Sequence, residues 1–95
     1  MRSHHRLDKN QEQIVRALRD FGMSVLPLVS GADILVGFMG MNFLFEIKDG
    51  SKPTSQRMLT PTEVRFHAQW RGQIHTVLSA EEIIRIINDK VRWVK

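Results

Sequence analysis

Three ionisable residues, Asp33, Glu46 and Lys48, have the types and the spacing of a site for a divalent cation. Carboxylates supply the oxygen ligands that Mg²⁺ and Mn²⁺ prefer, and the backbone carbonyl of Ile47 lies between Glu46 and Lys48 in the sequence. A cation there would lower the pKa of a bound water and stabilise charge on a phosphate. Lys48 would orient that water, help to deprotonate it, or meet the phosphate as a point charge. The alternative is a salt bridge at a strand end without a chemical role.

A β-hairpin is predicted to position these three residues. Two apolar runs, residues 33–39 and 42–48, flank a two-residue loop that we assign to residues 40–41. In this register Asp33 lies opposite Lys48. The pairs closer to the loop are wholly apolar: 34 with 47, 36 with 45, and 38 with 43. Because side chains alternate along a strand, these pairs face a core, and we expect the three charged side chains to converge on the opposite face.

The other elements complete a predicted α/β fold. Apolar residues at helical spacing predict helices, and short apolar runs predict strands. The order helix, strand, hairpin, helix, strand, helix predicts a mixed sheet flanked by helices. Helices are expected over residues 8–21, 60–71 and from Ser79 onward, and strands over residues 23–28, 33–39, 42–48 and 74–78. Residues 1–95 are expected to form a single stand-alone domain, with residues 1–7 as a flexible N-terminus. Residues 91–95 are either a terminal strand or a docked tail.

The second helix carries residues that bear on the site. Thr60, Pro61 and Glu63 have the spacing of a capping box at a helix start. Glu63 therefore either lies near the charged cluster or only caps its helix. Phe66 and Trp70, one helical turn apart, are more typical of core residues than of a base-stacking platform.

The composition favours a polyanionic partner. Lys and Arg outnumber Asp and Glu by 14 to 10, the formal net charge is +4, and the sequence pI is about 10.1. Residues 49–60 form a polar loop carrying Lys52 and Arg57, which we predict to contact DNA together with Ser30. The alternative is a solvated connection. The absence of cysteine excludes disulfides, thiolate zinc sites and cysteine nucleophiles. No apolar run approaches the ~20 residues of a membrane span, and the polar start lacks a signal region.

The motif and its context resemble a known nuclease superfamily. An aspartate followed by Glu46-Ile47-Lys48 on a hairpin, with a helix before and a helix-strand pair after, resembles the restriction-endonuclease-like nucleases of the PD-(D/E)xK type. Residues 31–37, 45–48 and 59–72 are similar to the small stand-alone VRR-NUC (virus-type replication-repair nuclease) domains. The resemblance covers the chain from about Asn10 to Ile87. It implies a restriction-endonuclease-like α-β-β-β-α-β core.

The resemblance also implies roles for individual residues. Asp33 and Glu46 correspond to metal ligands, and Lys48 corresponds to the catalytic lysine. Ala32 stands where the family often has proline, and Gln11 stands where many relatives have a glutamate on the first helix. Helical periodicity independently places Gln11 on the inner face, so its amide oxygen is expected to reach the metal or the water. A neutral ligand would hold a second metal more weakly.

We therefore predict a Mg²⁺- or Mn²⁺-dependent DNA endonuclease of phage or repair type, in the cytoplasm of a bacterium or a phage-infected host cell. Resolving a four-way (Holliday) junction requires two cuts in opposed strands, whereas this domain has room for one site. Archaeal Holliday-junction resolvases, which the chain also resembles, are dimers, so we expect a symmetric homodimer. The alternatives are a flap or single-strand nuclease, and a non-catalytic DNA-binding module with a nuclease-like fold. The predicted dimer contacts are Met23, Met39, Met41, Trp93 and Val94.

Overall fold

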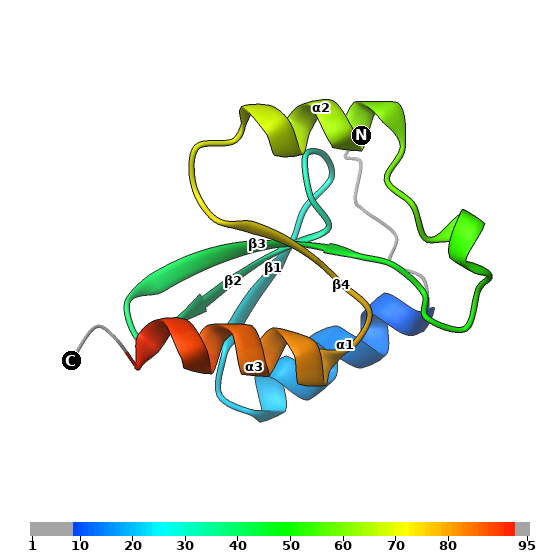
Figure 1. The fold of residues 1–95 in the computed structure, drawn as a ribbon. Helices are drawn as coiled ribbons and strands as arrows, with labels where there is room; N and C mark the ends of the chain where they lie inside the picture. Colours follow the sequence, from blue (N-terminus) through cyan, green and yellow to red (C-terminus); the bar gives the residue numbers. More distant parts are fainter. Residues whose placement is uncertain (1–8, 93–95) are drawn as a thin grey trace, which may run out of the picture.

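A four-stranded mixed sheet with helices on both faces forms the protein (Figure 1), in a computed structural model that describes residues 9–92. The elements are α1 (Lys9–Asp20), β1 (Ser24–Pro27), β2 (Ile34–Phe38), β3 (Met41–Ile47), the 3₁₀ turn η1 (Thr54–Gln56), α2 (Pro61–Gln69), β4 (Ile74–Val77) and α3 (Ala80–Val91). The strand order is β1-β2-β3-β4, with two antiparallel pairings followed by a parallel one. This confirms the predicted α/β class, the mixed sheet and the order of the elements.

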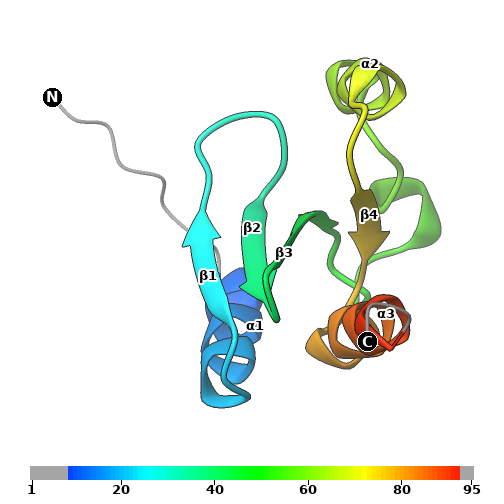
Figure 2. The same ribbon diagram turned by 90° about the vertical axis from the view of Figure 1, so that its left-hand side faces the viewer.

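The helices lie in two layers. Helices α1 and α3 cover one face of the sheet, and α2 lies beyond the other face (Figure 2). No helix within residues 9–92 is long and apolar enough to cross a bilayer. The predicted flexible residues 1–7, and the predicted dimer contacts Trp93 and Val94, lie outside the described residues. Val91 is the last residue of α3, so at least this residue belongs to neither a strand nor a tail.

The hydrophobic core lies between the sheet and the layer of α1 and α3. Its fully buried side chains come from the centre of the hairpin and from the inner faces of both helices; they include Leu18, Ile34, Val36, Phe43, Phe45, Ile83 and Ile87. Met23 is also buried in this core, at 4% exposure, so its expected place in a dimer contact is wrong. The helix predicted over residues 8–21 ends one residue earlier, at Asp20, and Phe21 is 51% exposed.

The hairpin has the predicted faces but a different register. Its two-residue loop is Met39-Gly40, with φ angles of 54° and 78°, because the right-handed twist of paired strands favours a turn with positive φ at both central positions. Relative to the predicted loop at residues 40–41, every pair moves by two positions. Asp33 therefore lies beside Glu46 rather than opposite Lys48. A shift of two residues keeps each side chain on its face, so the predicted core pairs still point inward.

The two later helices start as predicted. Glu63 and Thr60 form both hydrogen bonds of a capping box, with Pro61 as the first residue of α2. The Ser79 hydroxyl accepts a hydrogen bond from the Glu82 backbone N–H at 3.2 Å and caps α3. Helix α2 ends at Gln69, two residues before the predicted end, and Trp70 has an extended backbone.

We predict that Met39→Asn stabilises the protein. A left-handed backbone is unfavourable for methionine but is well tolerated by asparagine, and Asn-Gly is the preferred pair for this turn. Met39 is 67% exposed, so little packing is lost. The free energy of unfolding, measured in urea, should rise by about 0.5–1 kcal/mol. Met58→Asn is the control, because Met58 is 69% exposed and has no positive φ; a decrease in stability confined to Met39→Asn would contradict the turn geometry.

Candidate active site

The open end of the hairpin brings Asp33, Glu46 and Lys48 together. Their side chains lie on the sheet face toward α2, because the alternate residues Phe45 and Ile47 point into the core. The Lys48 Nζ lies 3.6 Å from Glu46 Oε2. Two hydrogen bonds to β3 fix the position of Asp33. Its N–H donates to the Phe45 carbonyl at 3.0 Å, and its Oδ2 accepts from the Ile47 N–H at 2.7 Å. The convergence expected from the sequence is present in this geometry.

The backbone of Ile47 faces the same group. In a β-strand the N–H and the C=O of one residue point to the same edge, and the Ile47 N–H points to the Asp33 carboxylate. The Ile47 carbonyl is therefore directed toward the β2 side, where Asp33 leaves the ladder. An oxygen acceptor from the main chain accompanies the two carboxylates.

Glu63 on α2 joins this group and also caps its helix. A single oxygen, Glu63 Oε1, accepts hydrogen bonds from Lys48 Nζ at 2.8 Å and from the Thr60 N–H at 2.9 Å. The sequence left open whether Glu63 lies near the site or caps the helix, and the structure shows both. Lys48 and Glu63 are 15 residues apart, so no local sequence pattern predicts their contact. The contact depends on where α2 packs against the sheet.

The electrostatics follow from crowding three acids around one lysine. Burial, followed by the nearby carboxylates of Asp33 and Glu63, raises the pKa of Glu46 to about 8. Burial also raises the pKa of Glu63, but hydrogen bonds from Lys48 and the Thr60 backbone outweigh it and bring the pKa to about 2. For Lys48, burial lowers the pKa, whereas Glu63 and then Glu46 raise it above its ordinary value. Glu46 is therefore the group whose charge is least compensated.

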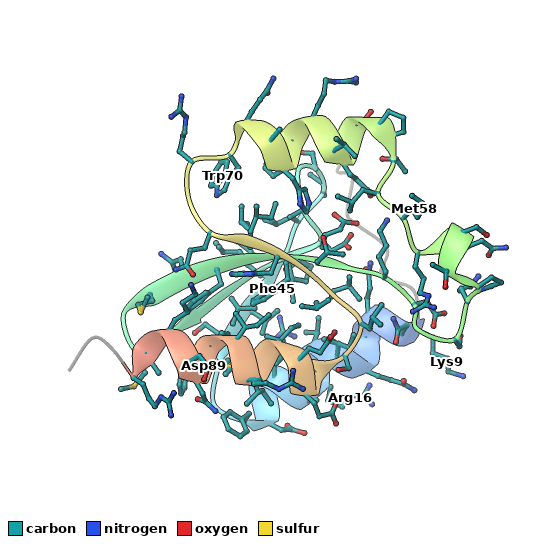
Figure 3. All side chains as sticks on the ribbon, in the orientation of Figure 1. Lys9, Arg16, Phe45, Met58, Trp70 and Asp89 are labelled. Carbon is teal, nitrogen blue, oxygen red and sulfur yellow. The ribbon has the colours of Figure 1, made fainter. Side chains whose placement is uncertain are left out.

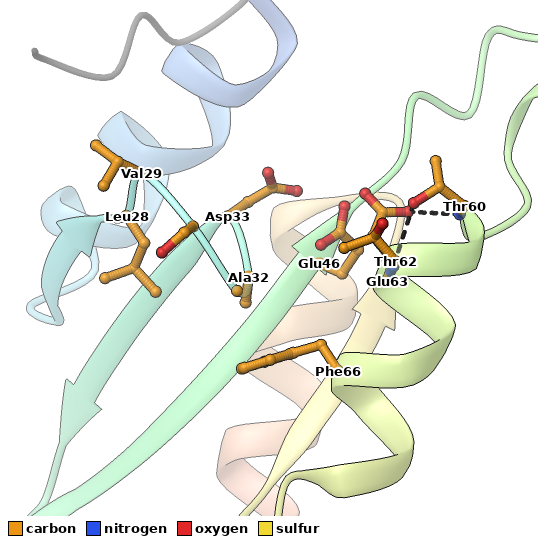
Figure 4. A pocket seen from close by; sticks show the side chains of 11 residues that line it. Leu28, Val29, Ala32, Asp33, Glu46, Thr60, Thr62, Glu63 and Phe66 are labelled. Carbon is orange, nitrogen blue, oxygen red and sulfur yellow. Dashed lines mark hydrogen bonds between the residues drawn. The ribbon is translucent and has the colours of Figure 1, made fainter.

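A cavity of about 330 Å³ opens beside these residues (Figure 4). Asp33, Glu46 and Glu63 line one part of it. Leu28 and Val29 from the β1–β2 loop and Phe66 from α2 line the apolar part. The cavity thus has an acidic part and an apolar part next to each other.

The other residues predicted for the site are not all in the cavity. Ser30 is exposed and contributes to the cavity wall. Gln11 is buried on α1, as its helical position predicted, but it is not among the residues that line the cavity. Lys52 and Arg57 lie on the loop around η1, outside the cavity lining; Lys52 is exposed, and the Arg57 guanidinium donates to Thr54 Oγ1 at 3.0 Å.

The donor set fits a hard divalent cation better than a softer one. Within residues 9–92 no three His, Cys, Asp or Glu side chains are grouped so that they could hold a metal ion. Mg²⁺, however, is commonly bound through one or two carboxylates and keeps several waters. Asp33 and Glu46 with the Ile47 carbonyl meet that requirement. With all three acids ionised and Lys48 protonated, the cluster would carry a charge that a dication neutralises.

Comparison with known proteins gives no match for this chain. No protein-family model matches it, and no curated protein and no solved structure is significantly similar to it. The likeness to VRR-NUC domains rests on the motifs in the sequence and stays a prediction.

We predict that the stabilising effect of Glu46→Gln on the metal-free protein grows with pH. A carboxyl whose pKa is raised on folding binds more protons in the folded than in the unfolded state, so its contribution to stability falls as pH rises from about 4.5 to about 8. Glutamine has no such loss. The difference in free energy of unfolding between variant and wild type should widen by at most ~1.4 kcal/mol per pH unit in this window.

The measurement is urea unfolding in a chelator at several pH values. The lowered pKa of His75, caused by burial and by Lys90, changes stability in the opposite direction, but it is common to both proteins and cancels in the difference. Glu81→Gln, at an exposed position of α3, is the matched control. A difference between Glu46→Gln and wild type that is constant or shrinks as pH rises would show that Glu46 is not protonated in the folded state.

Proposed function

We propose that this protein is a metal-dependent phosphodiester hydrolase that acts on DNA. The observation that carries the proposal is the convergence of Asp33, Glu46 and Lys48 beside a cavity. All three are attached to the hairpin whose opposite face forms the core. A substrate in the cavity would therefore meet a set of charges that the fold holds in place.

The cost of burying Glu46 supports a role beyond stability. A carboxylate that is 4% exposed loses hydration, and the two neighbouring acids add repulsion. A structural ion pair would need only one acid beside Lys48, and Glu63 already provides it at 2.8 Å. A salt bridge without a chemical role, the alternative stated from the sequence, therefore does not explain why Asp33 and Glu46 are also present. Perturbed acids that share a cavity wall are typical of catalytic and metal-binding sites.

Asp33, Glu46 and the Ile47 carbonyl are the groups that would hold the cation. When bound, it supplies electrostatic stabilisation of the phosphate and makes a neighbouring water more acidic. Lys48, between two carboxylates, is favoured in its charged form and would act on the phosphate as a cation and hydrogen-bond donor. Glu63 holds the Lys48 ammonium and sets its position, so it is a positioning residue.

Three further points favour DNA as the substrate. The chain has a net charge of +4, which attracts a polyanion. The loop around η1 offers Lys52 for phosphate contact. The motif resembles those of VRR-NUC nucleases, which implies Mg²⁺ or Mn²⁺ as the cation and branched DNA, including four-way junctions, as the substrate. The competing function is a DNA-binding module without catalysis, in which Lys52 and Arg57 would serve the same purpose.

We predict that Glu46→Gln and Lys48→Ala each lower DNA cleavage by at least about 100-fold, because each removes a preorganised charge at the reacting phosphate. Labelled duplex, flap and four-way-junction DNAs should be incubated with Mg²⁺ or Mn²⁺, and with a chelator as the metal control. DNA affinity should fall much less, since the proposed contacts to the DNA backbone come mainly from other residues, on the basic loop. Glu12→Gln and Lys90→Ala, both at exposed helix positions, are the matched controls.

The same assay separates the competing functions. Wild-type protein that binds DNA but cuts none of the substrates with either metal would favour the binding module. Cleavage of flaps or single strands with sparing of junctions would retain the hydrolase and replace the substrate. Equal losses of binding and cleavage in a folded Glu46→Gln variant would show that this carboxyl serves binding alone.

We further propose that the protein works as a homodimer, because paired cuts in a four-way junction need two sites at a fixed separation. A twofold dimer is the commonest arrangement that supplies them. Light scattering at micromolar concentration should give twice the 11.0 kDa mass of the chain. Met39 is the most exposed of the predicted contact residues that the structure describes, so Met39→Lys should weaken a dimer that uses this turn. A single species of chain mass that still makes paired cuts would contradict the proposed dimer.

A further inference from the structure

Two stacked aromatic residues extend from the cavity along α2. The rings of Phe66 and Trp70 are 5.5 Å apart between centroids and inclined by 26°. Phe66 lines the cavity (Figure 4), whereas Trp70, which Figure 3 labels near the end of α2, is an exposed residue with 45% of its surface accessible. The sequence favoured a core role for both residues. Phe66 is only partly buried, and Trp70, directly after α2, is exposed, so neither is a buried core residue.

Neighbouring glycines hold this aromatic pair in place. A Cβ on Gly31 would lie 3.0 Å from Phe66 Cζ, so the β1–β2 loop packs directly against the ring. A Cβ on Gly72 would lie 2.8 Å from Trp70 Nε1, so the chain after α2 closes against the indole edge. Phe66 thus has one neighbour in Gly31 and a second in Trp70. The pair is fixed at its edges while much of the Trp70 surface stays exposed.

The aromatic pair is aligned with the acidic part of the cavity. Glu63 and Phe66 are three residues apart on α2, and Trp70 is the capping residue four positions further on, whose N–H still donates to the Phe66 carbonyl at 3.0 Å, so the three follow one another along one side of the helix and its end. The rise of an α-helix spreads them over about 10 Å. This length corresponds to the step from a phosphate at the acids to the base of a nearby nucleotide. Arg65 and Arg71, both exposed, add positive charge near the same segment.

We propose that Phe66 and Trp70 form a stacking platform for one unpaired nucleobase of the DNA strand whose phosphate occupies the acidic part of the cavity. This inference rests on the proposed function and names the substrate class: DNA with an unstacked base next to the cut. Every nucleobase has an aromatic face, so such a platform does not depend on sequence. In a continuous duplex the bases are stacked on one another, so no unpaired base is available to the platform. Unpaired bases occur at a branch point, whether in a flap or at a four-way junction.

The charge around the platform favours DNA over an apolar partner. The exposed Arg65 and Arg71 are next to Phe66 and Trp70 in the sequence, and positive charge near an aromatic pair suits a nucleotide, which combines an aromatic base with an anionic phosphate. The platform also continues into a cavity whose other wall carries Asp33 and Glu46. A protein partner that covered only the indole would not extend into that cavity. The test must also distinguish DNA from a second copy of this chain bound at Trp70.

The test compares binding to two DNAs in a chelator, so that no cleavage occurs. One is a forked duplex with a single unpaired 2-aminopurine at the branch, and the other is the same strand in a continuous duplex. Wild-type protein should quench the fluorescence of the unpaired base. Trp70→Leu should weaken binding to the fork by roughly 5- to 150-fold and binding to the duplex by less than about twofold. Trp70→Phe should retain most of the affinity, because it retains a ring.

Phe21→Leu is the matched control, since Phe21 is 51% exposed and directly follows α1, on the other face of the sheet. It should bind both DNAs as wild type does, and circular dichroism should show that each variant is folded. Equal losses on fork and duplex, or no loss for Trp70→Leu, would overturn the platform. A folded Trp70→Leu protein that loses self-association but keeps its preference for the fork would instead assign the indole to a dimer contact.

Failure of the two proposals can be told apart. If no DNA is cleaved under any metal condition while Trp70→Leu still loses fork binding, the hydrolase is wrong and the platform remains. If branched DNA is cleaved and Trp70→Leu keeps both the wild-type preference for the fork and the wild-type quenching, the platform is wrong and the hydrolase remains.

Discussion

The burial of the Glu46 carboxylate is the constraint on which the site depends. The hairpin places Glu46 between two residues of the core, so its side chain cannot leave the opposite face without breaking strand pairing. That face also holds Asp33 and Lys48, whose Nζ lies 3.6 Å from the Glu46 carboxylate. A group in this position is unfavourable when charged, and its pKa is raised accordingly to about 8. Glu63 already pairs with Lys48 at 2.8 Å, and the hairpin adds two further acids, Asp33 and Glu46, so we interpret the cluster as a functional site.

Helix α2 depends on the same cluster for its position. It buries no side chain of its own, and its attachments near the site are the Glu63 contact with Lys48 and the packing of Phe66 on Gly31. Glu63 uses one oxygen for both the helix cap and the lysine, so the start of the helix and the charge of the site are coupled. The thin coverage of this face leaves the cavity open to solvent. A site for a polymer such as DNA needs that access, whereas the core on the opposite face supplies the rigidity.

Much of this arrangement follows from the sequence, and the exceptions have physical causes. The period-2 pattern of the hairpin assigned its two faces correctly, and the capping box placed the start of α2. The register was wrong by two positions because the turn puts Met39 at a positive φ, which residue type alone disfavours. The exposure of Trp70 and the contact of Glu63 with Lys48 could not be predicted from the sequence. Both depend on how α2 packs on the sheet, which a local sequence pattern does not specify.

Calorimetric titration of the folded protein with Mn²⁺ is the most direct test of the proposed binding of a divalent cation by Asp33 and Glu46. A Mn²⁺ titration of the wild-type protein should show saturable binding, and Mg²⁺ should compete for the same site. Glu46→Gln and Asp33→Asn should each abolish that binding, whereas Glu81→Gln, at an exposed position on α3, should retain it. No saturable binding to the wild-type protein, or binding that is unchanged in Glu46→Gln, would contradict the assignment of this cluster as a metal site.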